Sequence, residues 1–316
     1  MGPMKRHEYW RQAYRKDRYL EPYGLAELKR RAEIVTNNDL DLSDELKLVI
    51  FKSCQKFDYW LIAWTHLLEE FQLRSFNPLT VFESGMLPKI KMDWPGLATG
   101  VRQFQRLNLK DGTFIAKYGK RRFLSRALER GDVHINPASF YNDPSLNSAI
   151  HDDELSIKVF RRSPLLDAAA KENVGDLGGV GSRFGVITET LRAPTNFYVY
   201  CMSVEFSPRL FGDFESDACL VVDPREFFSR IAETTADLLK GWRCFLTPIT
   251  YVDPFLYQRE PLDMVRCKSY EFAYQKEIRT YWLPPEPKAD LTPFDVTIGS
   301  MKRYATLIEL GNEASI

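Results

Sequence analysis

The run from Tyr274 to Trp282 places side chains that could do chemistry at alternate positions. Gln275, Glu277 and Arg279 are each two residues apart. In an extended strand, residues two apart point to the same side, so the pattern predicts an amide and a carboxylate that project together into a cleft. A carboxylate held in a dry cleft stabilises positive charge that develops during a reaction. An exposed strand with mixed charges has the same pattern, so this interpretation depends on the residues upstream.

The first supporting motif is a strand followed at once by a helix. Residues 114–118 predict a short strand that ends on Lys117 and Tyr118. A helix is predicted over 121–130, and Gly131 stands just past its end, where glycine is favoured. This motif brings a lysine and a tyrosine to the end of a strand.

The second motif is another strand and the turn after it. A strand is predicted over 132–136, and the Asn, Asp and Pro residues of 137–144 favour a turn. The turn carries three polar candidates for a binding site: Ser139, Tyr141 and Asn142.

The order of these motifs resembles a large uncharacterised bacterial family. Its members carry a Lys-Tyr strand, a helix, a Phe-Asn-Asp-Pro-like turn, a Cys-x-Ser strand and a final Glu-x-Arg strand. Cys201-Met202-Ser203 supplies the fourth motif, inside a predicted strand over 197–206. The match covers roughly residues 113–283, and this chain departs from it by inserting Tyr141 between Phe140 and Asn142.

The same layout resembles the ADP-ribosyltransferase superfamily, which includes nucleic-acid-modifying toxins of bacterial defence systems. The resemblance implies NAD as a substrate, with Glu277 as the catalytic glutamate and Gln275 as the residue that contacts the acceptor. Lys117 or Tyr118 would stand where the superfamily usually has Arg or His, and Ser139 or Tyr141 would follow. It also implies an RNA, DNA or protein acceptor, and an antitoxin protein as partner.

The chemistry assigns further roles to these residues. The two phosphates of NAD need donors, and the candidates are Lys117, Arg121 and Arg122, since arginine suits bidentate contact with phosphate. A nicotinamide ring needs an aromatic face, which Tyr118 or Tyr141 could provide. Asn142 belongs to the same set of expected cofactor contacts.

Two other functions remain open from the sequence. A binding module of the same fold, without catalysis, would hold a nucleotide or a partner peptide in the cleft. A metal-dependent nuclease would use the carboxylates of Asp152, Asp153 and Glu154, beside His151, because hard cations take clustered carboxylates. The basic runs 29–31 and 120–122 could contact phosphates of a nucleic acid.

Composition predicts a globular protein outside the membrane, and the order of predicted strands and helices predicts an α+β fold. The chain has 316 residues, with 43 basic and 43 acidic side chains, so no overall positive field favours nucleic acid. Its longest apolar run, 59–68, is only about ten residues, too short to cross a bilayer. The five cysteines contain no Cys-x-x-Cys pair, which argues against a structural zinc site and predicts a reducing, cytoplasmic location. The histidines show no ligand spacing; His66 is predicted to be structural, and His134 could approach the cleft.

The elements that position the motifs divide the chain into two parts. Residues 1–108 predict a helical N-terminal region, with a long apolar helix stripe from Leu46 to Phe71 and Ser43 as its N-cap. Residues 109–316 predict an ADP-ribosyltransferase-like domain with a mixed β core and flanking helices. Further strands are predicted over 218–222, 242–251, 271–282, 296–298 and 304–310. Helices are predicted over 165–172 and 225–240, and a mobile lid over the glycine-rich residues 175–185.

Overall fold

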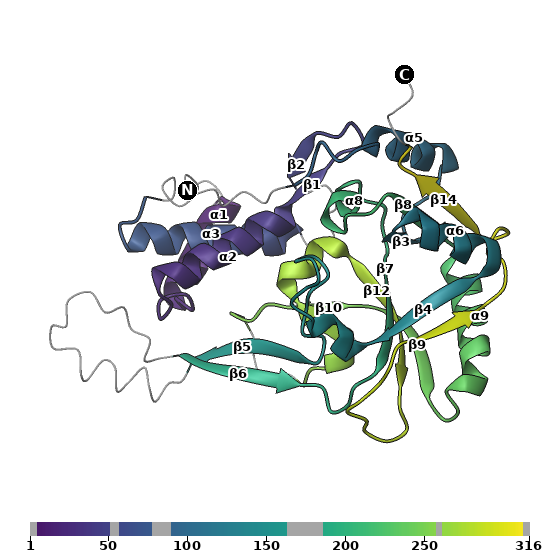
Figure 1. Cartoon of the computed structure of the whole chain (residues 1–316). Helices are drawn as coiled ribbons and strands as arrows, with labels where there is room; N and C mark the ends of the chain where they lie inside the picture. The colour runs from purple at the N-terminus through teal and green to yellow at the C-terminus, as the bar shows by residue number, and fades with distance from the viewer. Residues whose placement is uncertain (1–4, 51–56, 78–89, 163–185, 257–260, 312–316) are drawn as a thin grey trace.

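The computed structural model describes residues 5–50, 57–77, 90–162, 186–256 and 261–311. It confirms a mixed α and β chain in which the sheet of eight strands pairs antiparallel throughout. In Figure 1 this sheet and its helices form the body on the right, and α1 to α3 lie on the left.

The sheet is built from strands far apart in the chain. Its strands are β3 (Ile115–Gly119), β4 (Asp132–Pro137), β7 (Tyr198–Ser203), β8 (Ala218–Val222), β9 (Arg243–Pro248), β12 (Glu277–Leu283), β13 (Phe294–Thr297) and β14 (Ala305–Glu309). The order is β13-β4-β7-β3-β8-β14, while β12 pairs with β7 and β9.

Strand β7 is where the sheet divides. One edge of β7 pairs with β12 along its whole length. The other edge pairs with β4 at Tyr198 and Val199, and with β3 at Ser203. Neither β3 nor β4 pairs with residues 200–202, so these two strands separate there. The space for a site opens at this division.

The helices of this body follow local sequence signals. They are α6 (Arg121–Arg130), α8 (Arg209–Asp213) and α9 (Pro224–Leu238). Gly131 ends α6 with φ of 80°, the left-handed conformation that suits glycine. Asp223 caps α9 by accepting hydrogen bonds from the backbone N–H groups of Arg225 and Glu226, with Pro224 in the first turn. The predicted helices 121–130 and 225–240 are therefore confirmed.

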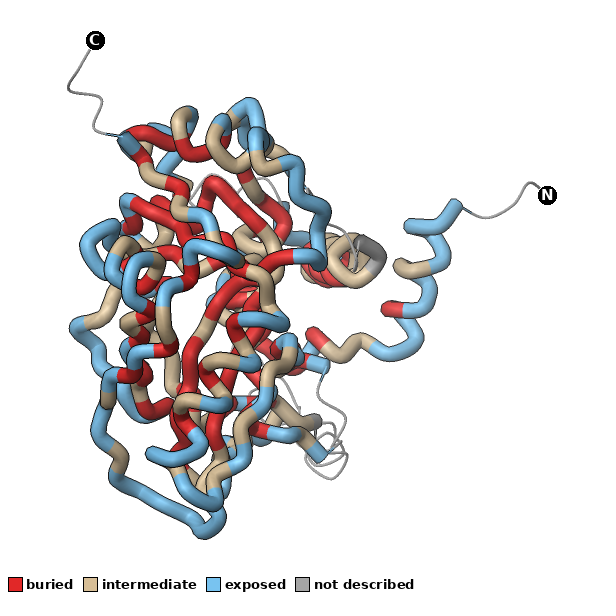
Figure 2. The backbone as a smooth tube through the Cα atoms, turned by 90° about the vertical axis from the view of Figure 1, so that its right-hand side faces the viewer, coloured by how far each residue is buried: buried red, intermediate tan, exposed pale blue. Residues whose placement is uncertain are grey.

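Two apolar clusters hold the sheet between these helices. One contains Leu124 of α6, Phe227 and Ile231 of α9, and Trp282 of β12. The other contains Val101, Phe114 and Ile308 on the opposite side, under the helix α5 (Leu97–Leu107). Figure 2 shows the buried segments running through the middle of this body.

The N-terminal part is helical, but the long helix predicted from Leu46 onward is wrong in its first residues. Its helices are α1 (Arg6–Lys16), α2 (Leu25–Asp39) and α3 (Phe57–Leu73). Residues 40–50 instead form a hairpin of β1 (Leu40–Leu42) and β2 (Leu48–Ile50). Ser43 is in the turn of this hairpin, where its Oγ accepts from the backbone N–H groups of Glu45 and Lys47, so it does not cap a helix. The apolar residues from Leu46 onward recur at steps of four and three, which is a helical spacing. The sequence pattern therefore does not indicate the short strand β2, since strands have period 2.

Short elements complete the chain. A hairpin of β5 (Ser156–Arg162) and β6 (Val186–Arg192) was not predicted, and in Figure 1 it extends below α1 to α3. Strands β10 (Thr250–Val252) and β11 (Cys267–Ser269) form a parallel pair. The described residues also include the short 3₁₀ helices η1 (Ala138–Asn142), η3 (Met264–Arg266) and η4 (Tyr270–Gln275). The predicted helix over 165–172 and lid over 175–185 lie outside the described residues.

The predicted strand over 271–282 is only partly correct. Residues 270–275 form η4, Lys276 takes the left-handed conformation with φ of 46°, and β12 begins at Glu277. Alternation therefore places Glu277 and Arg279 on one face, but Gln275 reaches the same place from the end of a 3₁₀ helix. The left-handed Lys276 produces that change of direction.

The N-terminal helices are joined to the body by buried polar contacts. Arg31 of α2 donates two hydrogen bonds to Asp253, at 2.9 and 2.8 Å, and both side chains are buried. Asn38 accepts from the backbone N–H of Tyr274 at 2.7 Å. The basic run 29–31 is therefore not a solvated face throughout. In the described part of the chain, no helix is both long and apolar enough to cross a membrane.

Candidate functional site

A cavity of about 400 Å³ lies where the sheet divides. Its walls come from β3, the end of β4, η1, β7, β11 and the junction of η4 with β12. Five of the predicted site residues line it together: Lys117, Tyr118, Tyr141, Gln275 and Glu277. The volume lies within the range of small-molecule sites, roughly 300–1,000 Å³.

Lys117 occupies the gap between β3 and β4. Its Nζ donates to the backbone oxygen of Cys201 at 2.7 Å, in the stretch of β7 that neither strand pairs with. The ammonium also lies over the ring of Tyr200, 4.4 Å from its centroid. No carboxylate among the described residues forms an ion pair with it. Burial therefore lowers the pKa of Lys117 below its usual value.

Glu277 belongs to a closed ring of four charged side chains at the wall of the cavity. Its Oε1 accepts from Nε of Arg279 at 2.8 Å, and its Oε2 accepts from Nζ of Lys268 at 3.0 Å. The same two cations hold Glu154, through Nη2 of Arg279 at 2.6 Å and Nζ of Lys268 at 3.2 Å. All four side chains are at most 5% exposed. Glu154, Lys268 and Glu277 line the cavity, and Arg279 lies behind them.

The ring keeps Glu277 ionised. Burial alone would raise the pKa of this carboxyl, but the charges of Arg279 and Lys268 outweigh it and lower the pKa to about 2. Burial would likewise lower the pKa of Lys268, but Glu154 and Glu277 hold it well above its usual value. The floor of the cavity therefore carries fixed charges in a largely dry environment, where electrostatic effects are strong.

Gln275 lies against this ring with its amide engaged. Its Nε2 donates to the backbone oxygen of Ala149 at 2.7 Å, and its Oε1 accepts from Nζ of Lys268 at 3.4 Å. The residue is 5% exposed. The structure brings Gln275 and Glu277 together as the sequence predicts. The amide of Gln275, however, forms its hydrogen bonds with the protein and does not point freely into the cavity.

Two tyrosines, Tyr118 and Tyr141, line the cavity. The hydroxyl of Tyr118 donates to the oxygen of Ser207 at 3.1 Å and accepts from its N–H at 2.8 Å, which fixes the ring. Tyr141 lies on η1 with its ring edge-on to Phe140, 5.4 Å between centroids. Oδ1 of Asn136, also in the cavity wall, is buried with no hydrogen-bond partner in the described part of the chain. A ligand could supply the missing donor.

Three predicted cofactor contacts lie outside the cavity. Arg121 is on the surface and pairs with Glu309 at 2.8 Å. Ser139 is exposed, and its Oγ accepts from Nδ2 of Asn196 at 2.8 Å. Asn142 is exposed at the end of η1. Of the residues of η1, Phe140 and Tyr141 line the cavity. His134 also lies elsewhere, with Nδ1 2.9 Å from Asp295 on β13.

The predicted metal-binding carboxylates point in different directions. Asp153 closes its own turn, accepting from the N–H of Leu155 at 3.1 Å. Asp152 and Glu154 both turn toward Lys268, at 3.7 and 3.2 Å. Across the described ranges, no group of three Asp, Glu, His or Cys side chains is arranged to hold a metal ion. Asp152 and Glu154 thus face a protein cation, and Asp153 faces the backbone of its own turn.

Asp152 has a different charge state from Glu277. It is largely buried, its side chain 15% exposed, and it lies beside Glu154. Burial, followed by the negative charge of Glu154, raises the pKa of Asp152 to about 7, although Lys268 opposes the shift. Three carboxylates and two cations thus meet here, and one proton can be added near neutral pH.

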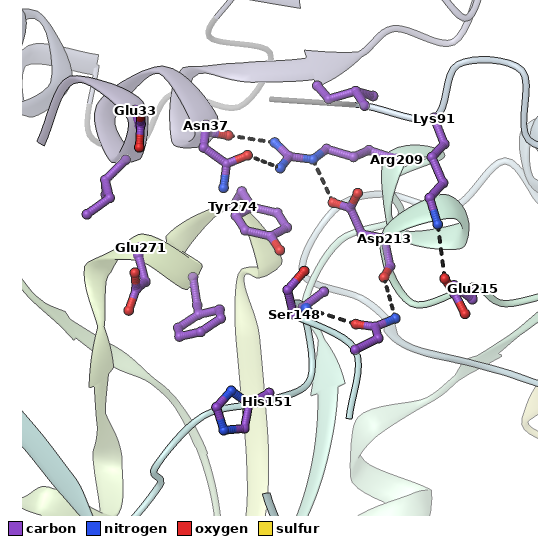
Figure 3. A pocket seen from close by; sticks show the side chains of 15 residues that line it. Glu33, Asn37, Lys91, Ser148, His151, Arg209, Asp213, Glu215, Glu271 and Tyr274 are labelled. Carbon is purple, nitrogen blue, oxygen red and sulfur yellow. Dashed lines mark hydrogen bonds and ion pairs between the residues drawn. The ribbon is translucent and has the colours of Figure 1, made fainter. Parts of the chain in front are cut away.

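A second, larger groove adjoins the cavity on its outer side. It measures about 840 Å³ and lies between α2 and the body, and Ala149 lines both spaces. Figure 3 shows Arg209 between Asn37 and Asp213, where it donates at 2.6 and 2.8 Å. Lys91 pairs with Glu215 at 3.1 Å beside them. The cations in the groove are thus already matched to carboxylates, which leaves a site without excess positive charge.

Sequence reasoning missed two residues of the site, Glu154 and Lys268. In the sequence Glu154 stands out only as part of an acidic run, because the cations that face it lie 114 and 125 residues away in the chain. Lys268 has no local signal at all. Only the approach of β11 to β12 brings it to Glu277.

Comparisons with protein-family models, with curated proteins and with solved structures find no match for the chain. The interpretation of the site therefore depends on its own geometry.

Proposed function

We propose that the chain cleaves the nicotinamide–ribose bond of NAD and transfers the ADP-ribosyl group, with Glu277 as the catalytic residue. The observation that carries the proposal is a buried glutamate held ionised in the wall of a cavity of about 400 Å³. Loss of nicotinamide builds positive charge on the ribose, and a fixed carboxylate in a dry site stabilises that charge.

The rest of the cavity suits this ligand. The resemblance to ADP-ribosyltransferases requires an early strand, a turn and a late strand to meet at one cleft, and β3, η1 and β12 all line this cavity. Tyr141 offers an aromatic surface to a nicotinamide ring. Oδ1 of Asn136 lacks a donor, which the carboxamide N–H of nicotinamide would supply. Lys117, with no carboxylate partner described, suits an oxygen of the phosphates.

The test is release of nicotinamide from NAD by the purified protein, measured with separate pools of RNA, DNA and cell protein and without any of them. Glu277→Gln is expected to lower the release by a factor of at least 10², the usual loss when a transition-state charge contact is removed. The matched control is Glu205→Gln, since Glu205 pairs with Lys276 at 2.6 Å outside the cavity. Folded wild-type protein that releases no nicotinamide in any pool would contradict the proposal.

One observation favours a second candidate, a nucleotide-binding module without catalysis. Both oxygens of Glu277 are already bound to Arg279 and Lys268, so less of its charge is available to a ligand. This candidate predicts that NAD raises the melting temperature of the protein without being consumed, and that Glu277→Gln retains that effect. The roles of toxin or defence effector, and an antitoxin partner, stay predictions from the resemblance.

A further inference from the structure

The residue expected to meet a macromolecular acceptor is occupied by the protein itself. Gln275 uses its Nε2 on the backbone of Ala149 and its Oε1 on Lys268, and it is 5% exposed. A macromolecule could meet this amide only after those contacts break. The reacting carbon would lie near Glu277, which is also 5% exposed. The geometry favours an acceptor small enough to enter the cavity with the ligand.

A second carboxylate stands beside the first in the cavity wall. Glu154 and Glu277 are joined through the same two cations, Lys268 and Arg279, and both line the cavity. Cleavage of a glycosidic bond with transfer to water commonly uses two carboxyl groups, one near the sugar and one that handles the proton of water. Glu154 occupies the place for the second role.

The charge of the cluster leaves room for that proton. Asp152, Glu154 and Glu277 supply three negative charges against the two positive charges of Lys268 and Arg279. One carboxylate can therefore accept a proton while both cations keep a partner. Glu154 lines the cavity and Asp152 does not, so a water molecule in the cavity meets the carboxylate of Glu154 before that of Asp152.

We propose that the acceptor is water and that Glu154 is its general base, so that the chain is an NAD glycohydrolase. The proposal rests on the proposed cleavage of NAD. The bond from the ribose C1 to the pyridinium nitrogen breaks, and its electron pair returns to nicotinamide. A bond from C1 to the water oxygen forms, and the proton of water passes to Glu154. The products are ADP-ribose, nicotinamide and one proton.

The first experiment measures products of NAD with the full-length protein and no added acceptor. ADP-ribose and nicotinamide are expected in equal amounts, and added RNA, DNA or protein should not increase the rate. Nicotinamide release that depends on an added macromolecule overturns the hydrolase inference and leaves the proposed bond cleavage standing. No release under any condition overturns the cleavage itself, and the hydrolase inference with it.

The second experiment separates a base from a merely structural residue. Glu154→Ala and Glu154→Gln are expected to lower ADP-ribose formation by about 10²- to 10⁴-fold, the range for loss of a general base. Azide needs no base, so it should restore nicotinamide release in Glu154→Ala and yield ADP-ribosyl azide. Glu277→Gln should not be restored. Circular dichroism shows whether each variant is folded, and a folded Glu154 variant that azide leaves inactive, or that hydrolyses NAD normally, overturns the role.

Discussion

At the scale of single residues, the site depends on an imbalance of charge. Glu277 and Glu154 share Lys268 and Arg279, and Asp152 adds a third carboxylate next to them. A buried charge without a full partner lowers the free energy of unfolding, so this cluster destabilises the fold near the place where chemistry is proposed. Structural carboxylate clusters are usually fully neutralised, and this one is not.

The imbalance predicts that Asp152→Asn stabilises the protein at high pH. The pKa of Asp152 is about 7 in the fold, above its ordinary 3.8. The folded state therefore binds the proton more tightly, and that contribution to stability is lost as pH rises from about 4 through about 7. Removing the charge should raise the free energy of unfolding at pH 8 by on the order of 1–3 kcal/mol, with little gain at pH 4.

Denaturant unfolding at pH 4 and pH 8 measures this difference. The control is Asp153→Ala, which should lose stability at both pH values because it removes the oxygen that accepts from the N–H of Leu155. Equal stability of Asp152→Asn and the wild type at pH 8 would contradict the expected charge state.

At the scale of elements, the N-terminal helices hold the segment that carries Gln275. Arg31 of α2 reaches Asp253 and also donates to the hydroxyl of Tyr270, at 3.2 Å. Tyr270 is the first residue of η4, and Gln275 is its last. Trp60 of α3 stacks on the same tyrosine, with 5.8 Å between ring centroids. Helices α2 and α3 thus hold the first residue of η4, the segment that ends at Gln275.

Arg31→Ala is expected to destabilise the protein by about 3–5 kcal/mol, because it leaves Asp253 buried without its cation. Arg30→Ala is the matched control. Its side chain is 70% exposed and lies 3.7 Å from Glu271, so its loss should cost under about 1 kcal/mol. Chemical denaturation measures the free energy of unfolding of both variants. A similar decrease in the two would show that the buried ion pair contributes no more to stability than the exposed one.

At the scale of the whole molecule, the boundary predicted at residue 108 passes through a shared core. Leu42, Leu97 and Val101 belong to the same apolar cluster as Phe114 and Ile308. Gly100 of α5 lies so close to Leu310 that an added Cβ would come within 2.5 Å of its Cδ2. Contact this close indicates that α5 packs as part of the body.

A chain that begins at residue 109 should therefore not unfold cooperatively. It would expose Phe114 and Ile308 and lose the pair of Arg31 with Asp253. Thermal unfolding followed by near-ultraviolet circular dichroism, with a chain that begins at residue 5 as control, measures the loss. A cooperative transition near that of the control would mean that the two parts fold separately.

Local signals determined much of the secondary structure from the sequence alone. The apolar strand predicted over 218–222 matches β8, and the helix predicted over 121–130 with Gly131 matches α6, because apolar patterns and caps act within a few residues. The same reasoning mistook 40–50 for part of a helical region, since a three-residue strand pair is fixed by its partner and not by its own pattern.

The candidate site was found in outline by sequence and completed by tertiary structure. Alternation alone places Glu277 beside Arg279, two residues away. The approach of Lys268 and Glu154 was decided by packing, because charges pair over a few ångströms in space whatever their distance along the chain. Glu154 lies 125 residues from Arg279, and no local pattern records such a pairing. The division of the sheet at β7, which opens the cavity, likewise exists only once three distant strands have met.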